Sequence, residues 1–388
     1  MGFNIFLNVL DWAIFSLIAL SVFYILFFTI ASKFYKNHLY PPSNKINRIL
    51  VLFPAYREDL VIISSIRDFL LQDYPKDRYE LVVISDHMQD STNEILRQMP
   101  VTLLEITFEQ SSKAKALNFA MAHFSEDPFD IVTILDADNL VESSYLSEIN
   151  NAYASGVKAL QAHRIAKNLH TDVAVFDAVS EEVNNTIFRK GHCAVGLSSA
   201  LIGSGMAFDV DWFRENVLHL HTSGEDKELE ALLLKQSIHI EYLNCLYVRD
   251  EKTSQQKVFS SQRQRWLAAQ YSMLFSKIKE IPMCIHTRNF NYLDKIVQWM
   301  LLPRVVMFGL TCLIAVLLLI VDWENSIKWF VLIFVMCSVF ALATPWLLFK
   351  VFLKKCWKTV PVLFVSMAMN FFKIKKGKVF IHTPHGQD

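Results

Sequence analysis

The sequence predicts an α/β fold in which a mostly parallel sheet forms the body of one domain and apolar helices attach that domain to a membrane. Strand-like and helix-like segments alternate through the middle of the chain, a rhythm typical of parallel sheets with right-handed crossovers. One apolar strand ends in two closely spaced aspartates, and long apolar segments flank the alternating region. These three observations place a ligand site at one edge of the sheet of a membrane-attached protein.

The alternating region begins after a Pro-containing linker at residues 40–44 and contains no internal repeat. Short apolar runs with polar ends are typical of buried strands. The expected strands are 49–53, 81–85, 101–106 and 131–135, and the expected helices are 59–71, 90–99, 113–124 and 143–154. Neither GxGxxG nor GxxxxGKS/T occurs in the chain. A bound phosphate would therefore depend on a metal ion and on side chains.

Three segments are apolar enough to cross a bilayer core, which needs about 20 residues: 12–32, 305–321 and 329–349. Basic residues follow the first and the last of them, so the positive-inside rule predicts an outside N-terminus and a cytoplasmic domain. A cleaved signal peptide is disfavoured because the first segment lacks a basic start. Residues 359–372 are apolar but short, which is typical of an interfacial or re-entrant helix. We expect an integral protein of the plasma or inner membrane with four parts: 1–47, 48–281, 282–358 and 359–388.

Composition excludes several other classes of protein. The 38 basic and 38 acidic residues give a formal net charge of zero, so no nucleic-acid partner is expected, since that would require a basic surface. The six cysteines form no CxxC pair, which favours free thiols over disulfides or zinc ligands. A transporter would need more spans and ionisable residues within them.

Carboxylates recur where the expected strands end. Residues 131–135 run into Asp136 and Asp138, and two carboxylates at such a position suit a hard divalent ion that bridges to substrate phosphates. Glu58 and Asp86 also follow strands; Asp86 fits ligand binding and helix capping equally well, whereas Asp90 is better explained as a helix cap. Several acids at one sheet edge require something cationic or donor-rich among them.

The order of these motifs resembles the family 2 glycosyltransferases, in the membrane-embedded branch that includes cellulose, hyaluronan and chitin synthases. The resemblance covers residues 49–266 and rests on several ordered motifs, together with Asp86 at the place of the family's uridine-binding aspartate. The motifs are Pro54-Ala-Tyr-Arg-Glu58, Lys113-Ala-Lys-Ala-Leu-Asn118, Asp136-Ala-Asp138, the glycine-containing acceptor-site strand Ile202-Gly-Ser-Gly-Met-Ala-Phe208, Ser223-Gly-Glu-Asp-Lys-Glu228 and Gln262-Arg-Gln-Arg-Trp266. Two departures affect the nucleoside pocket: Arg57 replaces the family's Asn, and His87 replaces its second Asp.

The resemblance implies a GT-A, Rossmann-like fold and a metal-dependent, inverting transfer of a sugar from a UDP-sugar. It implies Asp226 as the catalytic base and Asp138 and Asp136 as ligands of Mn²⁺ or Mg²⁺. The implied nucleotide-sugar contacts are Ala55, Tyr56, Glu58, Asp86, Lys113, Asp136, Asp138 and Arg265; the implied acceptor contacts are Gly205, Glu225, Gln262 and Trp266. For Lys113, a solvated helix residue is the alternative.

Several of these implied site residues are expected to lie on two further helices. Asp226 precedes a helix-forming stretch, so its carboxylate is expected in a first turn, as a base or only as a cap. Gln262, Arg265 and Trp266 stand at i, i+3 and i+4 and share one helix face, whereas Arg263 and Gln264 are expected to point elsewhere. The alternative is an amphipathic membrane-surface helix with a buried Trp, and both descriptions can hold.

The acceptor stays open between a saccharide and a lipid-linked group, because three spans are too few to enclose a polysaccharide channel. Homo-oligomers or a partner membrane subunit could supply more spans. One alternative is single-sugar transfer to a membrane lipid, as in enzymes like ceramide glucosyltransferase; another is a non-catalytic nucleotide-sugar-binding subunit. Residues 380–385 resemble the gating loop of cellulose synthases, with a disordered basic tail as the rival interpretation.

Overall fold

The structure is a computed structural model that describes residues 2–220 and 224–356 and the separate positions 359, 361, 362, 365, 366 and 369. The gating-loop hypothesis for residues 380–385 lies outside the described residues. So does most of the expected interfacial helix at 359–372.

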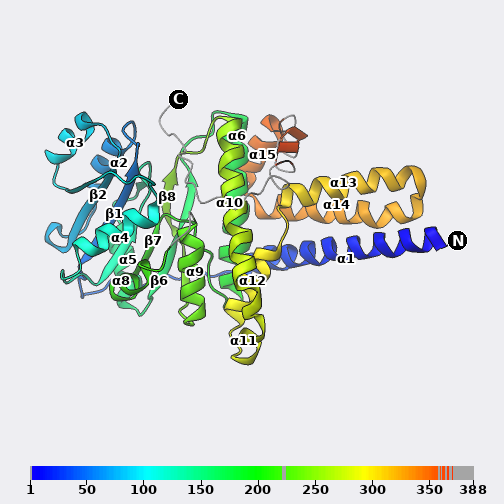
Figure 1. The fold of residues 1–388 in the computed structure, drawn as a ribbon, viewed down its shortest axis with the longest axis horizontal. Helices are drawn as coiled ribbons and strands as arrows, with labels where there is room; N and C mark the ends of the chain where they lie inside the picture. Colours follow the sequence, from blue (N-terminus) through cyan, green and yellow to red (C-terminus); the bar gives the residue numbers. More distant parts are fainter. Residues whose placement is uncertain are drawn as a thin grey trace.

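One mixed sheet forms the body of the domain at the left of Figure 1. Its order is β3-β2-β1-β4-β7-β6-β8-β5, and most neighbouring strands are parallel, which confirms the expected α/β fold. β7 is antiparallel to both neighbours, and β5 is antiparallel to β8. The strands are β1 (Ile49–Tyr56), β2 (Tyr79–Asp86), β3 (Thr102–Ile106), β4 (Ile131–Ile134), β5 (Leu140–Val141), β6 (Ala159–Ala166), β7 (Met206–Asp209) and β8 (Ile240–Asp250).

Helices cover both faces of this sheet, which explains why β1 is an uninterrupted apolar run. Leu50 and Leu52 point into one core, and Ile49, Val51 and Phe53 point into the other, as the two-residue period of a strand requires. The first core includes side chains of α4 (Lys113–His123), α8 (Val210–Val217) and α9 (Glu225–Lys235). The second includes side chains of α2 (Ile62–Phe69), α3 (Asp90–Arg97) and α5 (Tyr145–Ala154).

A layer of helices separates the sheet from the apolar end of the molecule (Figure 1). It contains α6 (Asp172–Asn184), a π-helical turn η3 (Asn185–Gly191), α10 (Gln256–Lys277) and α12 (Phe290–Met300). Lys295 of α12 forms a buried ion pair with Glu230 of α9 at 2.9 Å, and Ile296 and Trp299 join the first core. We therefore propose that the catalytic unit ends after Met300, beyond the expected boundary at 281.

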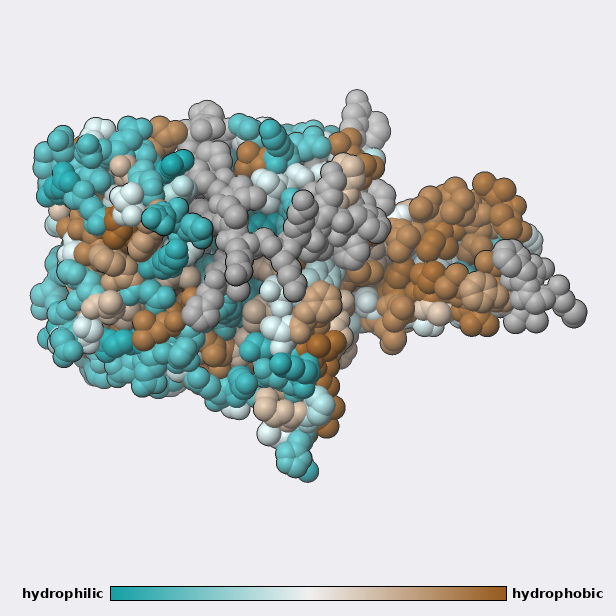
Figure 2. Space-filling model, viewed as in Figure 1, coloured by the Kyte–Doolittle hydropathy of each residue, from teal (hydrophilic) through white to brown (hydrophobic). Residues whose placement is uncertain are grey.

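Three helices are long and apolar enough to cross a membrane in the described part of the chain: α1 (Gly2–Ala31), α13 (Arg304–Val321) and α14 (Trp323–Ala343). They lie side by side and project from the sheet domain (Figure 1), and their surface is predominantly apolar (Figure 2). The expected span at 329–349 is misplaced by about six residues. Asp322 caps α14 by accepting from the Asn325 N–H at 3.2 Å, and Pro345 separates α14 from the short helix α15 (Trp346–Lys355).

The first apolar helix is tightly packed against the layer of helices. The ring of His192 stacks on Phe28 of α1 with a centroid distance of 3.6 Å. The Tyr24 hydroxyl of the same helix donates to Asp294 of α12 at 2.7 Å and lies 3.0 Å from His192 Nε2. Gly191 permits this approach, because a Cβ there would lie 2.2 Å from the Phe28 carbonyl oxygen.

Gly191→Ala is therefore expected to lower stability, because backbone atoms of α1 would have to move away from η3. Overpacking of this kind costs about 1–3 kcal/mol, and thermal unfolding of the detergent-solubilised protein measures it. Gly156→Ala is the control for glycine replacement: nothing lies within 4 Å of the added Cβ, and its cost comes only from a φ of +102°. If Gly191→Ala lowered stability less than Gly156→Ala does, this explanation of how α1 packs against η3 would be wrong.

Candidate active site

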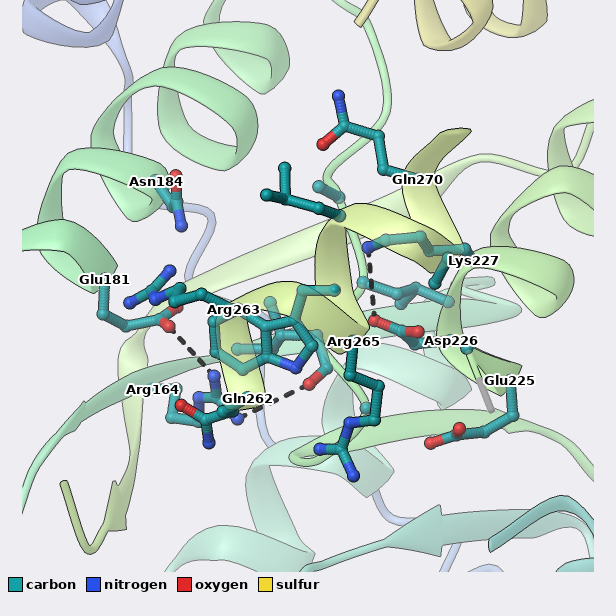
Figure 3. A pocket seen from close by; sticks show the side chains of 18 of the residues that line it. Arg164, Glu181, Asn184, Glu225, Asp226, Lys227, Gln262, Arg263, Arg265 and Gln270 are labelled. Atoms are coloured by element: carbon teal, nitrogen blue, oxygen red, sulfur yellow. Dashed lines mark hydrogen bonds and ion pairs between the residues drawn. The ribbon is translucent and has the colours of Figure 1, made fainter. Parts of the chain in front are cut away.

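One cavity of about 450 Å³ collects nearly all the side chains that the sequence indicated. It lies where β1, β2 and β4 end and where α9 and α10 pass over the sheet, and Figure 3 shows the part lined by α6, α9 and α10. The sequence-predicted residues that line it are Ala55, Tyr56, Glu58, Asp86, Lys113, Asp136, Asp138, Glu225, Asp226, Gln262, Arg265 and Trp266. Carboxylates from three strand ends therefore meet at one sheet edge, as expected for a parallel sheet.

The turn after β4 holds both aspartates in place. Asn139 accepts a hydrogen bond from the Asp136 N–H at 3.0 Å and donates to Asp138 Oδ1 at 3.1 Å. The other oxygen of Asp138 accepts from the Glu251 N–H, just beyond β8, at 2.6 Å. Asp138 is only 3% exposed, so its carboxylate is preorganised rather than solvated. Sequence reasoning missed Asn139, although an Asx residue after a strand-end pair is a recognisable turn signal.

The carboxylate oxygens of Asp136 and Asp138 are suitable ligands for Mg²⁺ or Mn²⁺, because hard divalent ions prefer oxygen. Among the described residues no group of three or more His, Cys, Asp or Glu side chains could hold a metal alone. Ions of this kind are usually held by one or two carboxylates together with substrate phosphates and water. Asp136 and Asp138 suit that arrangement, in which a bound diphosphate completes the coordination.

Lys113 provides the positive charge beside them. It opens α4 after the Ser112 cap, and its ammonium donates to Asp136 and, at 2.6 Å, to the Gly203 carbonyl oxygen. Burial alone would lower the pKa of Lys113, but the carboxylates of Asp136 and Glu225 outweigh it and hold the pKa above its ordinary value. A solvated helix residue is therefore the wrong description of Lys113.

Glu225 and Asp226 both lie in the first turn of α9. Gly224 is the N-cap of this helix, so neither acid occupies the N-cap position, and the helix dipole favours negative charge at both acids. The carboxylate of Asp226 lies 3.7 Å from Lys227 Nζ and points into the cavity beside Glu225 (Figure 3). Burial raises the pKa of Glu225 to about 7; Lys113 opposes the shift and Asp226 adds to it.

The raised pKa of Glu225 predicts a pH-dependent stability. Between pH 4.5, the ordinary value, and about 7, the folded chain binds more protons than the unfolded chain. The free energy of unfolding therefore falls as pH rises through this window, by up to about 1.4 kcal/mol per pH unit. Glu225→Gln is expected to remove the decline, whereas Glu148→Gln in the first turn of α5 should keep it. Unfolding of the EDTA-treated protein in detergent across this window tests the sign; an unchanged decline in Glu225→Gln would exclude this cause.

The Gln-x-x-Arg-Trp stretch lies on α10, and its three named side chains all line the cavity. In Figure 3, Arg265 extends between Gln262 and the Glu225–Asp226 pair. Burial lowers the pKa of Arg265, and the carboxylates of Glu225, Asp226 and Asp136 oppose that shift. The expectation for Arg263 was wrong: its long side chain turns into the same cavity, pairs with Asp177 of α6 and lies 4.5 Å over the Trp266 ring.

The position of Gly205 corrects its expected role as an acceptor contact. A Cβ there would meet Val248 of β8 at 2.8 Å and Ala162 of β6 at 3.4 Å, so this glycine permits close packing of strands and does not line the cavity. Gly203, two residues earlier, faces the site instead. Its φ of +86° directs its carbonyl to Lys113, and a Cβ would lie 3.6 Å from the Glu225 carboxylate.

The two departures from the family pattern lie next to the end of the cavity formed by β1 and β2, and neither side chain lines the cavity. Asp86 is buried at the end of β2, and its carboxylate lies 2.6 Å from His87 Nδ1. His87 and Arg57 both have left-handed φ values, 56° and 55°, and the His87 ring packs edge-on to Tyr56. Asp86 caps no helix: α3 follows Gln89, no side chain caps it, and Asp90 is its first residue rather than the predicted cap.

A buried charged network lines another part of the same cavity, and sequence reasoning missed it. Arg164 of β6 and Arg189 of η3 each donate to Glu181 of α6 at 2.9 Å, and Asp250 lies 3.4 Å from Arg164 and 2.9 Å from Lys252. Burial opposes ionisation of Glu181, but its cationic neighbours outweigh it and hold the pKa of Glu181 well below the ordinary value. These residues lie far apart along the chain, and no motif connects them.

Comparison with known proteins identifies the family. The family described as "Glycosyltransferase like family 2" matches residues 47–269, more than half of the chain. The chain belongs to this family.

Two known proteins are similar to this chain, one in sequence and one in structure. The chain is 22% identical over 237 residues to the probable glycosyltransferase YdaM of Bacillus subtilis, which covers 56% of this chain and 54% of that protein. The chain thus spans about half the length of the curated relative it matches. A solved structure of the mannosyltransferase PcManGT from Pyrobaculum calidifontis, in complex with GDP-Man and Mn²⁺, shares the fold. It matches with a TM-score of 0.54 and 18% identity, over 84% of this chain and 96% of that one.

Proposed function

We propose that this family 2 glycosyltransferase is a membrane-bound, inverting and metal-dependent hexosyltransferase that uses a UDP-sugar. The observation that carries the proposal is the shared cavity: the base candidate Asp226, the carboxylates Asp136 and Asp138 and the cation Arg265 all line it. A site that brings these groups together serves both demands of the reaction, namely neutralisation of a diphosphate leaving group and deprotonation of an acceptor hydroxyl.

In the proposed reaction Asp226 accepts the proton of the acceptor hydroxyl while that oxygen attacks the anomeric carbon of the donor. The bond between this carbon and the diphosphate breaks, and UDP leaves with the electron pair. Attack opposite the leaving group converts an α-linked donor into a β-linked product. A Mn²⁺ or Mg²⁺ ion held by Asp138 and Asp136 would supply positive charge to the diphosphate.

The remaining residues of the site bind and orient. Lys113 and Arg265 would pair with diphosphate oxygens, Arg265 with the two-pronged geometry that suits phosphate. Trp266 offers a flat apolar face for a sugar ring, and Gln262 offers hydrogen bonds to hydroxyls. Ala55, Tyr56, Glu58 and Asp86 would contact the nucleoside, and Glu225 and Gly203 the acceptor side of the site.

For the membrane, we propose that α1, α13 and α14 cross it, with the N-terminus outside and the sheet domain in the cytoplasm. The positions of Lys33, Lys36 and Lys45 after α1 and of Lys354 and Lys355 in the last turn of α15 support this orientation. The product would be a cell-surface or envelope polysaccharide or glycolipid. Single-sugar transfer to a membrane lipid, as in ceramide glucosyltransferase-like enzymes, is the alternative.

The deciding experiment is release of UDP by the detergent-purified protein with a panel of UDP-sugars, with and without Mn²⁺ or Mg²⁺. Metal-dependent release with one donor establishes the reaction and names the sugar. GDP-mannose is tested in parallel by release of GDP, because the structurally similar mannosyltransferase holds it. Binding of UDP and metal without turnover would leave two explanations, a missing lipid acceptor or a non-catalytic nucleotide-sugar-binding subunit, and would direct the search to the acceptor. Absence of binding to every nucleotide sugar would refute the proposal.

A further inference from the structure

The cavity does not end at the catalytic side chains. It continues past Gln262 and Arg263 of α10 to Ser21 and Ile25 of α1 and to Met307 of α13, both of which are helices long and apolar enough to cross a membrane. Ile25 and Met307 are buried, so this end of the cavity lies inside the packing of apolar helices. A ligand that fills it would have an apolar part.

Positive charge exceeds negative charge at the entrance to this apolar end. Arg304, the first residue of α13, donates from Nη2 to Asn184 Oδ1 at 2.7 Å, and its buried Nη1 has no hydrogen-bond partner among the described residues. Arg263 pairs with Asp177, yet its buried Nε also has no hydrogen-bond partner in the described part of the chain. The charges of Arg263 and Arg189 repel Arg304, and Glu181, which attracts it, already pairs with Arg164 and Arg189.

A buried guanidinium without a counter-ion is unfavourable, since a charge taken out of water loses its hydration and needs an opposite charge or hydrogen bonds in return. An anion beside Arg304 and Arg263 would satisfy the unused N–H groups with charge-assisted hydrogen bonds. Phosphate suits the planar, two-pronged donors of arginine. The position of these arginines, between the catalytic side chains and the apolar helices, is where the headgroup of a membrane lipid would lie.

We propose that the acceptor is a membrane lipid whose phosphate binds to Arg304 and Arg263 and whose hydrocarbon chain lies against α1 and α13. This inference rests on the proposed function and specifies its acceptor. A base such as Asp226 is useful only for a hydroxyl, because a phosphate oxygen is already ionised at neutral pH. The phosphate therefore occupies the arginine site while a hydroxyl further along the same headgroup reaches Asp226, as in a lipid-linked saccharide or a phospholipid with a polyol headgroup.

The test measures binding to the full-length protein in detergent micelles by isothermal titration calorimetry, with UDP and Mn²⁺ saturating so that the donor site is occupied. The probes are farnesyl phosphate, farnesol and inorganic phosphate. We expect farnesyl phosphate to bind at least about tenfold more tightly than either other probe. Farnesol lacks the phosphate that forms charge-assisted hydrogen bonds, and inorganic phosphate lacks the hydrocarbon chain that fills the apolar end of the cavity. Arg304→Gln should lose most of this preference, whereas the control Arg78→Gln, which changes a surface arginine next to Asp77, should keep it.

A second variant tests the apolar end of the cavity independently. Ser21→Trp adds a bulky ring where α1 lines the cavity, and it should weaken both farnesyl probes while UDP binding confirms that the variant is folded. Equal affinities for farnesyl phosphate and farnesol, or an unchanged preference in Arg304→Gln, would overturn the inference. Inorganic phosphate binding as tightly as farnesyl phosphate would show a free-anion site and also overturn it. Failure of UDP to bind the unmodified protein would instead refute the proposed function.

Discussion

Asp226→Asn is expected to reduce sugar transfer by about 10²- to 10⁴-fold, the range that a general base contributes. The amide has nearly the same size as the carboxylate but cannot accept the hydroxyl proton. Asp226 lies at the second position of α9, where Gly224 is the N-cap, so the substitution leaves the N-cap residue unchanged. We expect the affinity for UDP and Mn²⁺ to change little. Rates of product formation at saturating donor, together with UDP titration, separate these two effects.

The control for this variant is Asp211→Asn, which changes another first-turn aspartate at the start of α8. Asp211 is 82% exposed and pairs only with Arg214 in the described part of the chain. It should transfer sugar at the unmodified rate. If Asp226→Asn retained more than about a tenth of the activity, the base would have to be another residue, and Glu225 would be the next candidate because it lies beside Asp226 in the same cavity.

Asp138→Asn is expected to produce the second large loss, about 10²- to 10³-fold in kcat/KM, because a metal ion contributes several kcal/mol of charge stabilisation in the transition state. Loss of an ionised ligand should also shift the Mn²⁺ concentration needed for half-maximal activity upwards. The carbonyl oxygen of the introduced amide can still accept from the Glu251 N–H, so the fold is expected to persist. Metal titrations of UDP release, with EDTA as the zero point, measure the effect.

Asp90→Asn is a suitable control, since Asp90 is an exposed first-turn residue of α3 outside the cavity. An unchanged metal requirement in Asp138→Asn would place the metal elsewhere. Loss of activity with an unchanged metal requirement would show that the charge of Asp138 serves the reaction in some way other than metal binding.

Local patterns in the sequence were sufficient to predict which strand ends form the edge of the sheet and which residues line much of the candidate site. The apolar runs of β1, β2 and β4 are continuous because both faces of a parallel sheet are buried, and their carboxyl ends must meet at one edge. Asp86, Asp136 and Asp138 could therefore be placed together from the order of strands and acids alone. The i, i+3, i+4 spacing likewise placed Gln262, Arg265 and Trp266 on one face of α10.

Other features depended on contacts between distant segments. Gly203 and Gly205 are two residues apart in one motif, and only the packing of β7 between its neighbours decides which of them faces the cavity. Helical spacing placed Arg263 on another face of α10 and so predicted that it points away from the site. This spacing takes no account of the length of the arginine side chain, which reaches Asp177 on α6. The end of α14 was misplaced because hydropathy extends past Thr344, whereas the backbone is interrupted at Pro345.

The sequence by itself determined the class of fold, the family and most of the residues that line the cavity near the strand ends, because these follow from short-range periodicity and from motifs of fixed spacing. Only the tertiary structure decided that this cavity reaches α1 and α13 and that Arg164, Arg189, Arg263 and Arg304 line it. The physical reason is that burial and charge balance belong to the folded assembly. The sequence around an arginine does not predict which carboxylate will form an ion pair with it. Nor does it predict whether all of its N–H groups will find hydrogen-bond acceptors in the folded protein.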